Sequence, residues 1–127
     1  MIRKAAQIFG VIYLLVGILG FVPALSFGTD AMGMSLLLGL FPINALHNII
    51  HIAIGILGLA LAGSLGNARS YFRALAVVYG LLAVLGLIPA TNTVFGLVPI
   101  GGLDVALHAL TAIVAAYLGW GMTTAEA

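Results

Sequence analysis

Two pairs of ionisable residues, each spaced four apart in an apolar stretch, are the residues of this chain best suited to chemistry. The first pair is His47 and His51, and the second is Asp104 and His108. Residues four apart on a helix lie about 6 Å apart along its axis, so both side chains of a pair can reach one ion. Three imidazoles and one carboxylate suit zinc, iron or divalent copper. The spacing therefore predicts a metal site wherever two helices bring the pairs together.

A haem group is the alternative ligand. His51 and His108 lie at equivalent positions of a repeat described below, so they could hold haem b between two helices as paired axial ligands. Gly55 and Ala112 are small and would leave room for the macrocycle. The segments expected beside this site carry no Arg or Lys to pair with haem propionates, which counts against haem.

The same residues could instead serve helix packing alone. On a helix, Asn44, His47, Asn48 and His51 fall on one stripe with the small residue Gly55. Polar groups beside small residues are typical of a helix–helix contact in membranes, where each hydrogen bond contributes about 0.6 kcal/mol. In either case, we expect Asn44 and Asn48 to orient ligands or contact neighbouring helices rather than bind an ion directly.

Composition places these residues in a membrane. Of 127 residues, 64% are hydrophobic and only 6% are charged, and the mean hydropathy is +1.31. A water-soluble domain could not cover its surface with so few charges, so we expect the lipid bilayer as the main partner. A net charge of +1 without a basic patch argues against nucleic-acid binding. Cysteine is absent, which excludes disulfides and thiolate ligands.

Four stretches are long and apolar enough to cross a bilayer, which takes about 20 residues. They run roughly over residues 5–25, 43–61, 72–89 and 103–120. Gly, Pro, Asn, Ser and the few charged residues separate them. The predicted fold is an all-α membrane protein with four transmembrane helices.

An internal repeat divides the chain into two halves of a single domain, residues 1–127. Residues 13–24 match residues 79–90, and residues 39–51 match residues 96–108. The first copy covers about 3–63 and the second about 69–121. Each copy holds two spans, so the copies share one orientation and are related by an axis along the membrane normal. This predicts a duplicated two-helix hairpin forming a four-helix bundle, with residues 28–41 and 91–99 covering its outer end.

The charged residues predict the orientation. Arg3 and Lys4 precede the first span, and Arg69 and Arg73 lie between the second and third, whereas Asp30 and Asp104 lie on the other side. Basic residues favour the cytoplasmic side. Both termini are therefore predicted to be cytoplasmic, and the histidine pairs to begin at the outer ends of their helices.

The motif around the first histidine pair resembles a known family. Residues 48–55 read N-x-x-H-x-x-x-G, they follow the run GLFPINALH, and Asp104 and His108 stand in the last span. In these residues the chain resembles the bacterial membrane family named domain of unknown function 4383, over nearly its whole length. The second copy departs from the first, since Val105 and Ala112 replace its Asn and Gly. The resemblance implies a bacterial cytoplasmic-membrane protein with four helices, and it implies no activity.

The sequence therefore predicts a small multi-pass protein of the bacterial inner membrane with a histidine-lined site near its outer face, binding a metal ion or haem. One alternative is an accessory subunit of a larger membrane complex, or a homo-oligomer, in which the polar face serves packing. Another is a small-solute transporter. An outer metal site could also be catalytic, but no nucleophile motif or nucleotide-binding motif identifies a substrate or a reaction.

Overall fold

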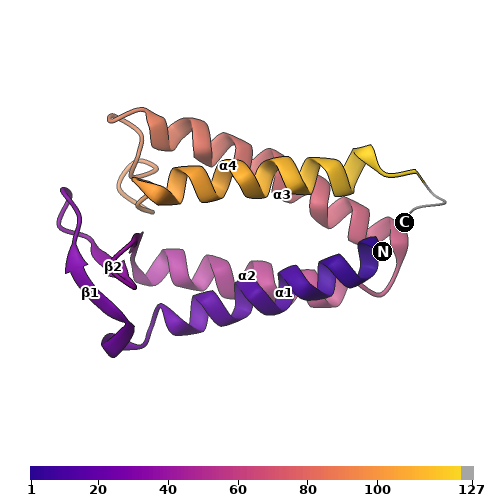
Figure 1. The fold of residues 1–127 in the computed structure, drawn as a ribbon, viewed down its shortest axis with the longest axis horizontal. Coiled ribbons are helices and arrows are strands. Elements are labelled where there is room, and N and C mark those ends of the chain that lie inside the picture. Colours follow the sequence, from indigo (N-terminus) through magenta and orange to yellow (C-terminus); the bar gives the residue numbers. More distant parts are fainter. Residues whose placement is uncertain (124–127) are drawn as a thin grey trace.

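The computed structural model describes residues 1–123 and is mainly helical (Figure 1). Its long helices are α1 (Ile2–Leu19), α2 (Ala45–Leu61), α3 (Leu65–Leu87) and α4 (Leu103–Ala116), and α4 continues as a π-helical turn, η2 (Tyr117–Gly121). A short 3₁₀ turn, η1 (Pro23–Leu25), follows α1. The order is the predicted one, but α3 begins seven residues before the expected position 72. Ser64 causes this early start, because its hydroxyl accepts a hydrogen bond from the Asn67 amide at 3.2 Å and caps the helix.

Within residues 1–123, three helical ranges are long and apolar enough to cross a membrane: Ile2–Leu19, Leu65–Leu87 and Leu103–Gly121. The fourth helix, α2, has 17 residues and a length of about 26 Å, near the lower limit for a hydrocarbon core of about 30 Å. Its outer side chains are as exposed as those of the longer helices, since Ile49, Ile56 and Leu57 are each more than half exposed. Apolar helices of this kind belong to a membrane-embedded protein.

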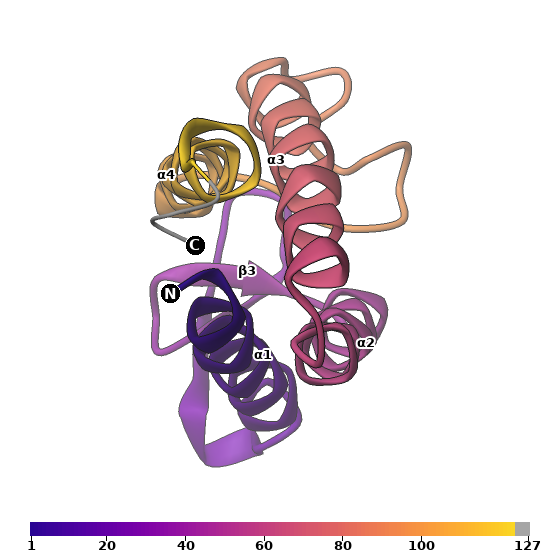
Figure 2. The ribbon, with the colours of Figure 1, turned by 90° about the vertical axis from the view of Figure 1, so that its right-hand side faces the viewer.

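The helices form two hairpins. α1 packs along α2, and α3 packs along α4 (Figures 1 and 2). α3 also contacts both α1 and α2, so it connects the hairpins. The N-terminus, η2 and the α2–α3 turn lie together at what we call the terminal end, and the sheet and residues 88–102 lie at the opposite, sheet end (Figure 1).

Glycines bring α1 and α2 into close backbone contact. A Cβ atom on Gly55 would lie 2.5 Å from the Leu14 amide nitrogen, and one on Gly10 would lie 2.9 Å from the Gly55 carbonyl oxygen. A Cβ atom on Gly17 would lie 2.7 Å from the Asn48 carbonyl oxygen. No larger residue fits at these distances, as is typical of small-residue contacts between membrane helices.

Equivalent contacts recur in the second hairpin. In the first, a Cβ atom on Gly20 would overlap the Asn48 side chain. In the second, a Cβ atom on Gly86 would lie 2.8 Å from a methyl carbon of Val105. Gly86 is the repeat partner of Gly20, and Val105 is the partner of Asn48, so the loss of Asn at this position leaves the helix contact in place.

A small antiparallel sheet corrects the all-α expectation. Its strands are β1 (Ser26–Thr29), β2 (Ser35–Leu37) and β3 (Phe41–Ile43), in the order β1-β2-β3. Asp30 builds the turn after β1, because its Oδ1 accepts hydrogen bonds from the Met32 and Met34 amides, both at 2.8 Å. The sheet lies at the end of the bundle where an apolar covering loop was expected, and its Leu37 and Ile43 side chains are buried.

Three arginines form hydrogen bonds that stabilise helix ends at the terminal end. Each donates a hydrogen bond of 2.8–2.9 Å to a backbone carbonyl near a helix C-terminus. The pairs are Arg3 with Ala62, Arg69 with Met122, and Arg73 with Gly119. These carbonyls lack partners within their helices, so the arginines stabilise the helix ends while marking one end of the molecule as basic.

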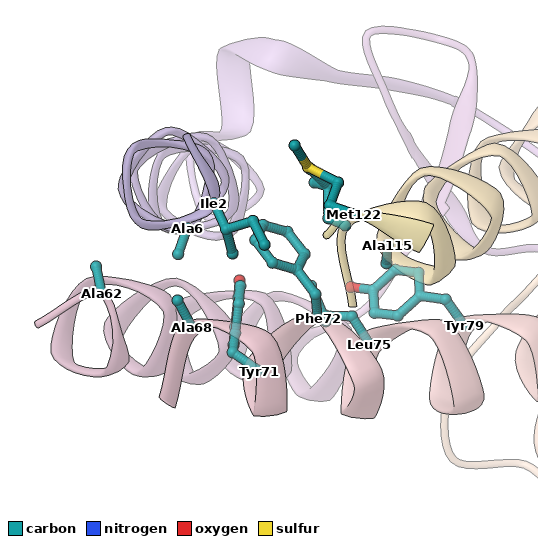
Figure 3. Packing of buried hydrophobic residues seen from close by; sticks show 11 residues of the cluster. Ile2, Ala6, Ala62, Ala68, Tyr71, Phe72, Leu75, Tyr79, Ala115 and Met122 are labelled. Carbon is teal, nitrogen blue, oxygen red and sulfur yellow. The ribbon is translucent and has the colours of Figure 1, made fainter. Parts of the chain in front are cut away.

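The apolar core lies nearest the terminal end (Figure 3). Phe72 of α3 is fully buried, and its ring meets the Phe9 ring of α1 edge-on at 5.2 Å. Ile2 and Ala6 of α1 close over it (Figure 3). This packing holds the hairpins together at one end and leaves the polar residues of α2 and α4 to meet nearer the sheet end.

Candidate metal site

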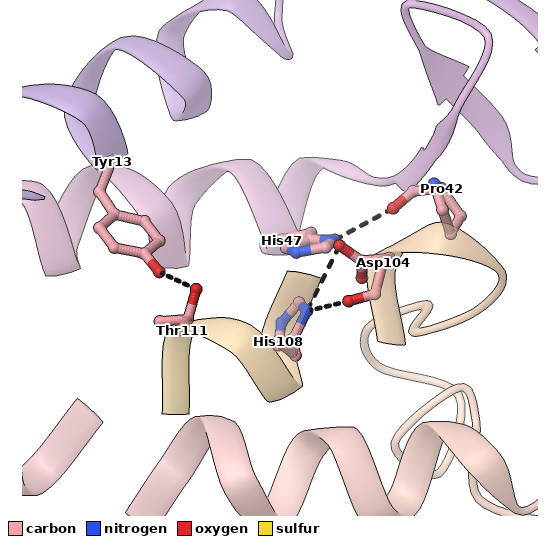
Figure 4. A network of polar contacts seen from close by, with 6 residues as sticks. All are labelled: Tyr13, Pro42, His47, Asp104, His108 and Thr111. Atoms are coloured by element: carbon pink, nitrogen blue, oxygen red, sulfur yellow. Dashed lines mark hydrogen bonds and ion pairs between the residues drawn. The ribbon is translucent and has the colours of Figure 1, made fainter. Parts of the chain in front are cut away.

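Three of the four predicted ligands come together between α2 and α4. His47, Asp104 and His108 each offer a ligand atom within 4.8 Å of the other two, and all three are buried. Figure 4 shows them pointing toward one another. Metal–ligand bonds of about 2.1 Å place neighbouring ligand atoms about 3.4 Å apart in a tetrahedral site. Side-chain movements of roughly 1 Å would therefore close the three groups around an ion.

Backbone carbonyls orient both imidazoles. The Nδ1 atom of His47 lies 3.2 Å from the Pro42 carbonyl oxygen, and that of His108 lies 2.7 Å from the Asp104 carbonyl oxygen (Figure 4). A carbonyl oxygen can only accept, so Nδ1 carries the hydrogen in both rings and Nε2 carries the lone pair. Metal-binding histidines in proteins are commonly held by such a second hydrogen bond.

Within the described chain, only one of the two oxygens of the Asp104 carboxylate has a polar partner. Its Oδ1 lies 3.3 Å from the His108 Nδ1. Within residues 1–123, its buried Oδ2 has no hydrogen-bond partner. A buried polar atom without a partner costs about 1–3 kcal/mol, and more when it is charged. Asp104 also stands in the first turn of α4, where the helix dipole favours a negative charge.

His51 lies beside this cluster rather than within it. Its ring centroid is 4.5 Å from that of His47, one helical turn away, and 5.4 Å from that of Tyr13. In the other hairpin, the Tyr79 ring stacks on His108 at 4.8 Å. Tyr13 and Tyr79 are repeat partners, as are His51 and His108, so each half pairs a tyrosine of its first helix with a histidine of its second.

The two asparagines differ in their positions. Asn44 caps α2, because its Oδ1 accepts from the His47 amide at 2.8 Å, and its Nδ2 donates to the Leu97 carbonyl at 2.8 Å. It therefore ties the start of the His47 helix to residues 88–102. Asn48 is buried against Gly20, the residue that follows α1, so its side chain serves the contact between the helices.

The family model described as Domain of unknown function (DUF4383) matches residues 3–121. The chain belongs to this family. The match includes all four helices and both halves of the site, which confirms the resemblance drawn from the motif. No curated protein and no solved structure matches the chain.

The cavities around the DUF4383 histidines are small for haem. Three cavities of about 150, 190 and 250 Å³ adjoin the cluster, whereas pockets for drug-sized molecules measure roughly 300–1,000 Å³. Side chains also pack directly on the rings that would be axial ligands, with Tyr79 stacked on His108 and His47 against His51. In this conformation, the arrangement favours an ion over a macrocycle.

Sequence reasoning did not place two groups of the DUF4383 site. The Pro42 carbonyl that orients His47 could not be predicted from residue types, because every residue has a backbone carbonyl. The Tyr79 ring on His108 could have been inferred, since Tyr13 and Tyr79 match in the repeat as the histidines do. Tyr13 also connects α1 to α4, because its hydroxyl lies 3.5 Å from the Thr111 Oγ1 (Figure 4).

Proposed function

We propose that this DUF4383 protein binds a divalent transition-metal ion, zinc, iron or copper, through His47, Asp104 and His108. The unpartnered Oδ2 of buried Asp104 carries the proposal. The His108 imidazole lies 3.3 Å from Oδ1 only, so Oδ2 is a buried polar atom without a partner among residues 1–123, which is costly whether or not His108 carries a charge. A divalent cation removes this cost, and the two oriented imidazoles supply neutral nitrogen ligands for it.

We further propose that the protein crosses the bacterial inner membrane four times, with both termini in the cytoplasm. α2 is short but apolar on its outer face, and the basic residues gather at the terminal end. Basic residues at that end favour a cytoplasmic location. The ion site then lies near the outer face, and the matching contacts of the two hairpins support an origin by duplication.

Elemental analysis and an optical spectrum of protein purified in mild detergent test the metal proposal. We expect one divalent ion per chain, with the content sharply reduced in His47→Ala and His108→Ala. Thr111→Val is the matched control, because Thr111 shares the site face of α4 and lies outside the cluster. His51→Ala decides whether that histidine is a fourth ligand.

Protein that contains no metal, and whose thermal stability does not change when zinc, iron or copper is added, would overturn the metal proposal. The polar face would then serve packing within this chain or against other subunits. An intense Soret band lost in both His51→Ala and His108→Ala would instead identify haem.

A further inference from the structure

A largely apolar cavity of about 250 Å³ lies between α2 and α3, and His47 and His108 of the proposed ion site are among the residues that line it. Ile50 and Ile54 of α2 and Val78 and Leu82 of α3 form its walls. Val78 is 47% exposed, and another lining residue, Leu97, is 58% exposed. Val78 lies on the exposed face of α3, which would meet lipid in a membrane-embedded bundle, and Leu97 lies in the segment at the sheet end. The cavity therefore opens sideways toward the hydrocarbon.

The repeat places a matching cavity of about 190 Å³ between α1 and α4. Four of its lining residues are the repeat partners of the four wall residues above, namely Leu107, Thr111, Ile12 and Val16. Here Thr111 replaces Ile54 and lies within 3.5 Å of the Tyr13 hydroxyl. The two halves thus differ in chemistry, and the α2–α3 cavity is the larger of the two, with aliphatic side chains at all four of these wall positions.

His51 is one of the polar residues that line this cavity, together with His47, Tyr79 and His108. It lines both cavities, is only 9% exposed and stands outside the three-residue cluster. Among residues 1–123, hydrogen bonds are formed by the rings of His47 and His108 and by no atom of the His51 ring. A ligand oxygen in the cavity would supply the hydrogen-bond partner that this imidazole lacks within the described chain.

We propose that the α2–α3 cavity binds a lipid-soluble quinone, which enters from the bilayer and accepts a hydrogen bond from His51 through a carbonyl oxygen. The ligand must be neutral, because the arginines lie at the terminal end and, among the described residues, no Lys or Arg lines the cavity to pair with a phosphate or carboxylate. A volume below that of drug-sized pockets suits a ring head whose tail stays in lipid. The proposal does not require an ion at the neighbouring site.

Titration calorimetry with menadione, a quinone without a tail, tests this on chelator-treated protein in detergent. We expect one site per chain. Val78→Trp should fill the mouth and weaken binding by about tenfold or more, and His51→Phe should weaken it about tenfold through the lost hydrogen bond. Val77→Trp is the matched control, because Val77 is 63% exposed and does not line the cavity. It should change the affinity by less than about twofold.

Naphthalene has the same fused rings but no carbonyl oxygen. It therefore distinguishes recognition of the quinone carbonyl by His51 from simple filling of an apolar space. Equal affinity for naphthalene and menadione, or equal loss in Val77→Trp and Val78→Trp, would overturn the proposal. Val78 is half-exposed and is not one of the buried core residues, so Val78→Trp stays informative if His51→Phe misfolds. Its metal content should match that of the unsubstituted protein, which separates failure of this proposal from failure of the metal site.

Discussion

Asp104 is the residue on which the candidate site depends most. It is buried beside two imidazoles whose nitrogen lone pairs are already oriented, yet one of its oxygens has no partner within the described chain. Packing alone gives no reason for such an atom, since an Asn or Leu would fill the space without burying a charge. Burial, orientation and an unsatisfied oxygen together are what an ion site requires.

Asp104→Asn should lower metal affinity more than any neighbouring substitution. It keeps the size of the side chain and removes the negative charge, so we expect a loss beyond the 10–100-fold typical of residues that only support ligands. Competition with a chelator of known affinity measures it. A loss no greater than that of Thr111→Val would show that the carboxylate does not bind the ion.

Metal affinity should also fall below about pH 6, because an imidazole must be neutral to coordinate an ion. With two histidine ligands, the logarithm of the affinity should fall by up to about two per pH unit in acid. His47→Ala should halve that slope, and Asp104→Asn should leave most of it. An affinity that does not fall at any acidic pH at which the protein stays folded would contradict histidine ligation.

At the scale of elements, the site depends on how α2 begins and on how closely α1 approaches it. Asn44 connects the first turn of α2 to residues 88–102. Glycine contacts then fix the distance between α1 and α2 along the rest of the helix. The Asn44 hydrogen bonds and the glycine contacts act on different parts of α2, so single substitutions can test their effects separately.

Asn44→Ala should reduce both stability and metal binding. Loss of the cap costs about 0.5–2 kcal/mol, and loss of the bond to Leu97 frees the turn that carries His47. Ser64→Ala is the control, because Ser64 caps α3 in the same way but far from the site. It should lower the melting temperature without changing metal affinity. If both variants weaken metal binding equally, Asn44 acts through stability alone.

Gly55→Ala should destabilise the protein by about 1–3 kcal/mol, because its new methyl group would meet the α1 backbone and push the helices apart. Gly66→Ala is the matched control. Nothing lies within 4 Å of a Cβ atom there, so alanine should be neutral or stabilising by up to about 1 kcal/mol. Unfolding in detergent measures both, and equal stability of the two variants would disprove close packing at Gly55.

At the scale of the whole molecule, the number and order of the long helices could be predicted from hydropathy and the repeat. Hydropathy detects the length of apolar segments, so it does not detect the polar first turns of α3, which Ser64 caps. The backbone pairing that forms the sheet also leaves no mark on hydropathy. Helical spacing placed His47 and His51 on one face. It could not show that His51 stays outside the cluster, because that depends on the relative position of the two hairpins.

The topology predicts opposite labelling of two loops in intact cells. A cysteine introduced by Asp30→Cys lies at the sheet end and should react with a membrane-impermeant maleimide. One introduced by Gly66→Cys lies at the terminal end and should react only after the cells are permeabilised. The chain has no native cysteine, so neither label has a background, and the reverse pattern would invert the orientation.

The division of the ligands between the hairpins has a consequence for synthesis. His47 leaves the ribosome with the first hairpin, and Asp104 and His108 follow only with the last helix. A nascent chain that stops after α2 or α3 has one histidine of the cluster and lacks Asp104, so it lacks the proposed ligand set. If the proposed ion binds, metal content would therefore report that the last helix has joined the first hairpin.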